Sequence, residues 1–144
     1  MIVTVLSDIT GSLSASPAPT FYHAEQYEQN LNDEASLPLV YLEHPVKATD
    51  TILPQGGQEA TYTVNLFFLD KSNLADDILT RQVIIDAMYA VKREFIVRLN
   101  LDSRVKAIKS VSYMEVYNVL DLNLDGLLVT LVVTLNDAAP VCLT

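Results

Sequence analysis

The 144-residue sequence contains a single cysteine, Cys142, and only two histidines, His23 and His44. One cysteine excludes an intrachain disulfide, and with it the disulfide framework of a small secreted protein. These residues do not show the His-x-x-x-His or Cys-x-x-Cys spacing of metal ligands, so we predict neither a metal site nor a cofactor. No nucleophile signature surrounds Cys142, and Ser7 and Ser12 lack a Gly-x-Ser-x-Gly context.

Basic residues are also scarce, with 9 lysines and arginines against 18 aspartates and glutamates. The net charge of −9 argues against a protein that grips nucleic acid, because such a protein presents a basic face to the phosphates. A protein that encloses DNA without binding it is compatible with this charge, since an acidic wall repels phosphates.

Long apolar runs are missing as well. The most apolar stretch, residues 127–135, is too short to span a membrane and contains Thr130 and Thr134. Residues 1–13 lack the basic leader and the long apolar run of a secretion signal. We therefore expect no membrane contact and a cytoplasmic protein at synthesis.

What the chain does have is apolar residues, which make up 50% of the sequence and give a mean hydropathy of +0.25. A chain of this length is expected to form one domain that buries roughly two thirds of its unfolded surface. The apolar excess has two explanations, which are a well-filled core and an apolar surface that is covered in an assembly. The sequence leaves both open.

The chain is organised around a strand that leads into a long helix. Residues 61–69 predict the strand, in which one face is formed by Tyr62, Val64, Leu66 and Phe68. Residues 74–99 predict the helix, whose apolar stripe is Ile84, Met88, Val91, Phe95 and Leu99, widened by Ile78, Ile85, Ile96 and Val97. Ser72 or Asn73 is the expected cap, with Asp76 and Asp77 in the first turn.

Further strands are predicted over residues 37–42, 105–119 and 127–135, and a short one over 20–23. The last strand is apolar or threonine on both faces, which favours a central position in a sheet. Strands, one helix and more strands indicate an α+β fold, in which the long helix packs on one face of a mainly antiparallel sheet.

The ends of the chain are expected to lie outside this domain. We predict an extended N-terminal arm and linker over residues 1–19, a single domain over 20–137 and a tail over 138–144. The first 13 residues fit a short helix or a strand equally well. Residues 46–59 predict a polar loop, with a glycine pair at a flexible tip between antiparallel strands.

Two acidic stretches are candidate sites. Residues 121–126 match the opening of a calcium loop, but the twelfth position, which needs a bidentate glutamate, is Val132. We therefore interpret Asp125 and Gly126 as a tight hairpin turn, which requires a positive φ. Asp70 with the two aspartates of the helix start could form a metal or general-base site. Helix capping explains the latter pair without any catalytic role.

Three stretches resemble small virion proteins of tailed phages, particularly those that infect Bacteroidetes bacteria. They are Phe-Tyr-His-Ala at 21–24 with Leu-Pro-Leu-Val-Tyr-Leu-Glu-His-Pro at 37–45, Tyr-Thr-Val-Asn-Leu-Phe-Phe-Leu-Asp at 62–70 with Lys-Arg-Glu-Phe-Ile at 92–96, and residues 121–130. The order of elements is similar to that of tail-terminator and neck (tail-completion) proteins. Members of that family carry a small sheet with a packed helix and assemble into rings between head and tail.

The resemblance implies a structural virion protein with no catalytic residues, located in the tail or neck of the virion. It would form a homo-oligomeric ring, a hexamer or a dodecamer, that contacts tail-tube, neck or portal proteins while DNA passes through. A small non-viral enzyme or ligand-binding domain, and a monomeric adaptor that docks by a sheet edge, are the alternatives.

A ring interface needs two different patches on each subunit. We predict that the N-terminal arm and the loop tip make contacts between subunits or to adjacent ring and tube proteins. The arm patch is Ile2, Val5, Leu6 and Ile9, and the tip patch is Gln55, Gly56, Gly57, Gln58 and Glu59.

Overall fold

The computed structural model describes residues 2–23, 37–71, 78–119 and 124–136. Its elements, in chain order, are α1 (Ile2–Gly11), β1 (Thr20–His23), β2 (Leu39–Leu42), β3 (Lys47–Ile52), β4 (Gln58–Lys71), α3 (Ile78–Leu101), β5 (Val105–Val119) and β6 (Leu124–Leu135). The strands form one sheet in the order β1-β2-β4-β6-β5, with β3 on the same edge of β4 as β2. Only β1 and β2 pair in parallel among these strands. The predicted α+β fold with a mainly antiparallel sheet is confirmed.

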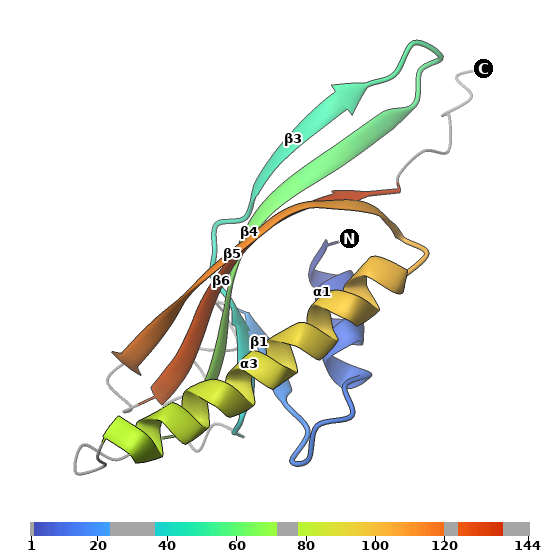
Figure 1. Cartoon of the computed structure of the whole chain (residues 1–144). Coiled ribbons are helices and arrows are strands. Elements are labelled where there is room, and N and C mark those ends of the chain that lie inside the picture. The colour runs from blue at the N-terminus through green and yellow to red at the C-terminus, as the bar shows by residue number, and fades with distance from the viewer. Residues whose placement is uncertain (1, 24–36, 72–77, 120–123, 137–144) are drawn as a thin grey trace.

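The long helix covers one face of the sheet, as Figure 1 shows for α3 lying diagonally across the strands. The core between them combines the inward residues of β4 and β6 with the predicted stripe of the helix, including Phe68, Phe95 and Leu131, which are fully buried. Phe68 and Phe95 meet edge to face, with ring centroids 5.4 Å apart. Burial of such large side chains is the main favourable contribution to folding. Val97 was expected to widen the stripe, but it is 58% exposed.

The N-terminal segment is a helix and not an extended arm. Ile2, Val5, Leu6 and Ile9 lie on one side of α1 and are buried against the core that α3 and the sheet form. Their spacing of three and four is the helical period, and tertiary packing of this apolar stripe stabilises a helix too short to persist alone. The segment therefore belongs to the domain, and the boundary predicted between residues 19 and 20 is wrong.

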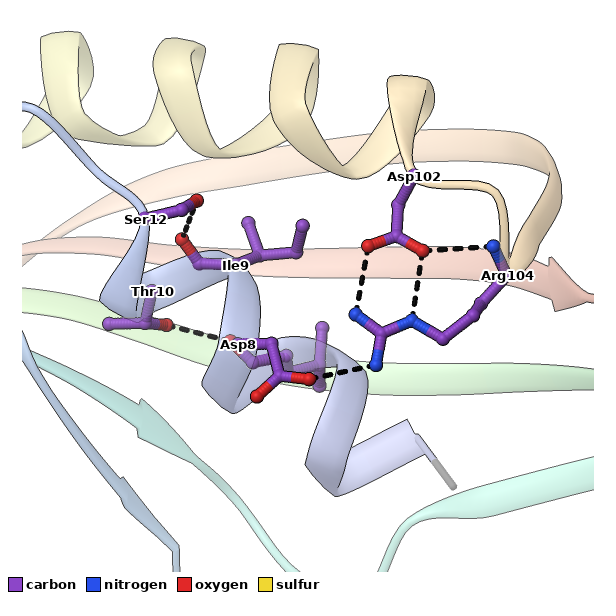
Figure 2. Close-up of polar contacts among 7 residues, drawn as sticks. Asp8, Ile9, Thr10, Ser12, Asp102 and Arg104 are labelled. Atoms are coloured by element: carbon purple, nitrogen blue, oxygen red, sulfur yellow. Dashed lines mark hydrogen bonds and ion pairs between the residues drawn. The ribbon is translucent and has the colours of Figure 1, made fainter.

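Polar contacts fasten α1 to the turn after α3 (Figure 2). The Arg104 guanidinium donates to Asp102 through Nε at 2.9 Å and Nη2 at 2.8 Å, and to Asp8 of α1 through Nη1 at 2.8 Å. Hydrogen bonds from the Arg104 side chain and backbone lower the pKa of Asp102 to about 2. Within α1, the Thr10 hydroxyl donates to the Leu6 carbonyl at 2.8 Å, which satisfies a buried hydroxyl.

The connector after α1 is held by α3. The backbone N–H of Ser14 donates to both carboxylate oxygens of Glu94, at 3.0 and 3.1 Å, and the Ser14 hydroxyl donates at 2.8 Å. These hydrogen bonds, together with Arg98, hold the pKa of Glu94 below its ordinary value. Two segments 80 residues apart in the sequence are therefore joined by one carboxylate.

A strand replaces most of the predicted polar loop at residues 46–59. β3 pairs with β4 from Lys47↔Thr63 to Ile52↔Gln58, and all six of its side chains are exposed. Backbone pairing with a central strand stabilises β3 without any apolar face of its own. The β3–β4 hairpin extends beyond the two helices (Figure 1). No helix among the described residues is both long and apolar enough to cross a membrane.

The predicted tight turn at Asp125 and Gly126 is also wrong. Both residues lie in β6, where Asp125 pairs with Asp70 and Gly126 with Leu69. Among the described glycines, only Gly56 has a positive φ, of 82°. Residues 121–123 of the calcium-like motif, and the predicted cap residues 72 and 73 with Asp76 and Asp77, lie outside the described residues.

Candidate interaction surfaces

The tip patch predicted from the glycine pair lies at the end of the β3–β4 hairpin. The turn is closed by the N–H of Leu53, which donates to the Gly57 carbonyl at 2.7 Å, and by the N–H of Gly56, which donates to the Leu53 carbonyl at 3.1 Å. Gln55 and Gly56 are exposed, whereas Gly57 is buried against Leu53. The tip is therefore an ordered turn with a small exposed surface.

The other two tip residues, Gln58 and Glu59, belong to β4. The Glu59 carboxylate forms an ion pair with Lys106 of β5. This contact joins β4, close to the hairpin turn, to the start of β5. The structure therefore brings together only part of the predicted interface, because the arm patch is in the core and Glu59 is engaged within the chain.

A different apolar surface lies along the outer side of α3. Its exposed residues are Leu79, Val83, Ala90, Val97 and Leu101, here called the outer stripe. Four of them are 58–78% exposed, namely Leu79, Val83, Val97 and Leu101. Spacings of four, seven, seven and four residues keep these side chains within about 40° of one line on the helix. The helix therefore carries apolar residues on its outer side as well as on its buried side.

The sheet face opposite the helices is uncharged at its centre. Cross-strand pairing of β4, β6 and β5 places there three rows of side chains, here called the open sheet face: Thr63, Val132 and Ser110; Asn65, Thr130 and Ser112; Phe67, Leu128 and Met114. The β4 and β6 members are half-buried and the β5 members are exposed, Met114 by 59%. A solvent-facing sheet surface usually carries charged residues, so this composition is typical of the centre of an interface.

Two hydrogen-bonded pairs lie on this side of the sheet. The Thr130 hydroxyl donates to Asn65 Oδ1 at 2.8 Å, and the hydroxyls of Thr61 and Thr134 lie 2.8 Å apart, beyond the Thr63–Val132 row. Met114 and Leu128 line a hollow of about 200 Å³. Asn65 and Thr130 therefore lose less hydrogen bonding when another surface covers them, because they already bond to each other.

An aromatic cluster lies where α3 meets β5. The ammonium of Lys92, a residue that is 6% exposed, lies 4.2 Å from the ring centroid of Tyr89 and 3.8 Å from that of Tyr113. Cation–π attraction of this kind stabilises a cation withdrawn from water. A hydrogen bond from Tyr113 and the charge of Lys92 hold the pKa of Tyr89 below its ordinary value. This cluster couples the helix to the edge strand.

Two of the acidic residues in the candidate stretches lie in the described part of the chain. Asp125, from the calcium-like motif, is fully buried and forms an ion pair with Arg81 of α3, with Oδ2 and Nη1 3.5 Å apart. Asp70, weighed for a metal or general-base site, accepts a hydrogen bond from the N–H of Lys71 at 2.8 Å. The Asp125 ion pair therefore joins β6 to the first turns of the described helix.

The two histidines come together although their sequence positions gave no sign of it. The rings of His23 and His44 lie with centroids 5.6 Å apart, beside Phe21. Within the described part of the chain, no group of three or more histidine, cysteine, aspartate or glutamate side chains could hold a metal ion. Cys142 lies outside the described residues.

Comparisons with known proteins add no family to this picture. No protein-family model matches the chain, and a search of curated proteins gave no match.

Proposed function

We propose that this chain is a structural virion protein of a tailed bacteriophage, which forms a homo-oligomeric ring at the head–tail junction or in the tail. The sequence resemblance to tail-terminator and tail-completion proteins suggests this class. The observation that carries the proposal is that apolar or uncharged surfaces lie on both outer sides of the two-layered domain, the outer stripe of α3 on one and the open sheet face on the other.

Two different contact surfaces on one subunit are what a head-to-tail assembly needs, since each copy must offer one surface to each neighbour. Such an assembly becomes a ring when the rotation between neighbours closes. The apolar excess of the sequence supports the same idea, because exposed apolar area of this kind marks association surfaces in soluble proteins.

The charge of the chain also fits this role. A net charge of −9 per subunit would keep DNA from adhering as it passes through a ring. Tail-tube, neck or portal proteins would then be the neighbours above and below. The projecting hairpin tip, with Gln55 and Gly56 exposed, is the segment we assign to these axial contacts.

The experiment is light scattering of the purified protein combined with negative-stain electron microscopy. We expect a discrete species of six or twelve times 15.9 kDa that appears as closed rings with a central opening. A monomer at all concentrations, or open fibres of variable length, would contradict the proposal. A monomer that binds a small molecule in solution would favour the ligand-binding alternative.

A further inference from the structure

Two surfaces formed by described residues, the outer stripe and the open sheet face, match each other in composition. α3 is apolar on both of its sides, and a helix of that composition is typically packed on both sides. The sheet is covered by helices on one face, where its core-facing residues meet α3. On the other face, none of the three rows of the open sheet face contains a charged residue.

We propose that the outer stripe of α3 in one copy packs on the open sheet face of the next copy, so that helix and sheet layers alternate through the assembly. This inference rests on the proposed ring and names its subunit interface. The two surfaces lie on opposite sides of one domain, so they cannot meet within one chain. At its Phe67 end the open sheet face meets a second buried cluster, which includes Leu39, Leu69 and Leu124. The part left for a partner therefore lies around Thr130 and Ser112, and a second copy supplies a complement to each surface.

The same chain already shows that the helix and the sheet fit together. The inner stripe of α3 packs on one face of β4, β6 and β5, and Phe95 meets Phe68 there at 5.4 Å. The 24 residues of α3 span about 36 Å, and the 15 residues of β5 span about 50 Å. β5 is therefore longer than α3, and its residues Ser110, Ser112 and Met114 carry the open sheet face on the side away from that helix.

The absence of charge from both surfaces limits the electrostatic repulsion between two copies. Two chains of net charge −9 repel each other, so their contact must be poor in carboxylates. The outer stripe is flanked by Asp86, which accepts a hydrogen bond from Gln82 at 3.0 Å, and by Arg93, while its axis is apolar. An apolar centre with a polar rim is the usual composition of a protein interface.

The test uses two variants of the full chain, each altered on one surface. Val83→Glu with Val97→Glu changes the outer stripe, and Ser112→Glu with Met114→Glu changes the open sheet face; all four residues are exposed. Thr4→Glu with Ser7→Glu on α1 adds the same charge at exposed positions outside both surfaces. If the Val83→Glu, Val97→Glu variant has a lower thermal midpoint than the control, Val83→Ser with Val97→Ser is used in its place.

Sedimentation velocity measures the association of each protein. We expect the control to assemble like the unaltered chain, and each surface variant to associate about a hundredfold more weakly or not at all, because a buried unpaired charge is costly. A mixture of the two variants should form a one-to-one dimer and nothing larger. In that dimer the intact stripe of one variant meets the intact sheet face of the other.

Three outcomes would overturn the inference: surface variants that assemble like the control, a mixture that stays monomeric, or a sheet-face variant that still dimerises alone. If the surface variants assemble like the control and still form rings, the proposed function stands and only the proposed subunit interface is wrong. Conversely, a mixed dimer from a protein whose unaltered form makes open fibres supports the interface and contradicts the ring. An unaltered chain that stays monomeric contradicts both.

Discussion

Gly126 faces the backbone of Phe68 so closely that a Cβ atom at this position would lie 1.8 Å from the Phe68 carbonyl oxygen. β4 and β6 are neighbours here, and Gly126 pairs with Leu69. The glycine is therefore required by the close approach of two strands and not by a turn. Phe68 in turn contacts Phe95, so the spacing of these strands also sets the position of α3.

Gly126→Ala is expected to destabilise the protein by about 3 kcal/mol, the upper end of the usual cost of overpacking, because the clash is with backbone that cannot rotate away. Chemical denaturation monitored by circular dichroism measures the effect. Gly11→Ala is the matched control, since a Cβ there meets nothing within 4 Å. It should change stability by no more than about 1 kcal/mol. Equal effects of both substitutions would show that the strands are farther apart than described.

Leu6→Ala tests the place of α1 in the core. Leu6 is fully buried, so the substitution should cost about 2–5 kcal/mol of unfolding free energy. Thr4→Ala, at an exposed position of the same helix, should stay within about 0.5 kcal/mol of the unaltered chain. A Leu6→Ala protein as stable as its control would restore the idea of a detached arm.

Phe95→Ala tests the buried side of α3. The ring is fully buried and packs edge to face on Phe68, so we expect a loss of about 3–5 kcal/mol. Asn100→Ala, at an exposed position of α3, is the control for helix propensity. The measurement is the midpoint of chemical denaturation, compared at an unchanged dependence of the unfolding free energy on denaturant concentration. An unchanged midpoint in Phe95→Ala would mean that another side of the helix faces the sheet.

Asp102 and Arg104 predict a defined pH dependence. Hydrogen bonds from Arg104 lower the pKa of Asp102 to about 2, from an ordinary value of 3.8. The folded state therefore binds its proton more weakly than the unfolded state does, and the stabilisation is present above about pH 4 and lost as the pH falls towards 2. The stability difference between the unaltered chain and Asp102→Asn should shrink over that window.

Urea unfolding from pH 7 down to acid measures this difference. Asp50→Asn removes a charge of the same sign from exposed β3 and serves as the control. The stability difference between the unaltered chain and this control should not shrink in the same way between pH 4 and 2. If the difference in unfolding free energy between the unaltered chain and Asp102→Asn stays constant from pH 7 down to acid, the Arg104 contact seen in Figure 2 does not form in solution.

Several elements could be predicted from the sequence because their periodicity reflects burial. The short strand at residues 20–23 has the predicted bounds, and the last strand contains the predicted residues and lies centrally, between β4 and β5. The inner stripe of α3 was also correct, with Met88 and Phe95 buried. In each case an apolar face repeats at the period of the element, and burial of that face fixes its orientation.

β3 could not be found in this way, because none of its side chains is buried and a strand without an apolar face has no period. Its existence depends on hydrogen bonds to β4. α1 was ambiguous for a related reason, since ten residues fit a helix or a strand until a partner surface selects one. The prediction for the arm patch was wrong because a short apolar segment has the same sequence pattern whether it packs on its own domain or on a neighbouring subunit.

By itself, the sequence determined the fold class, the central strand and the buried side of the long helix, because hydrophobic periodicity encodes which residues leave water. The tertiary structure alone decided that α1 belongs to the core, that Gly126 admits a neighbouring backbone, and that Val97 faces outward. It also decided which side chains remain exposed on α3 and on the sheet. Those outcomes depend on contacts between segments far apart in the chain, and no local pattern records them.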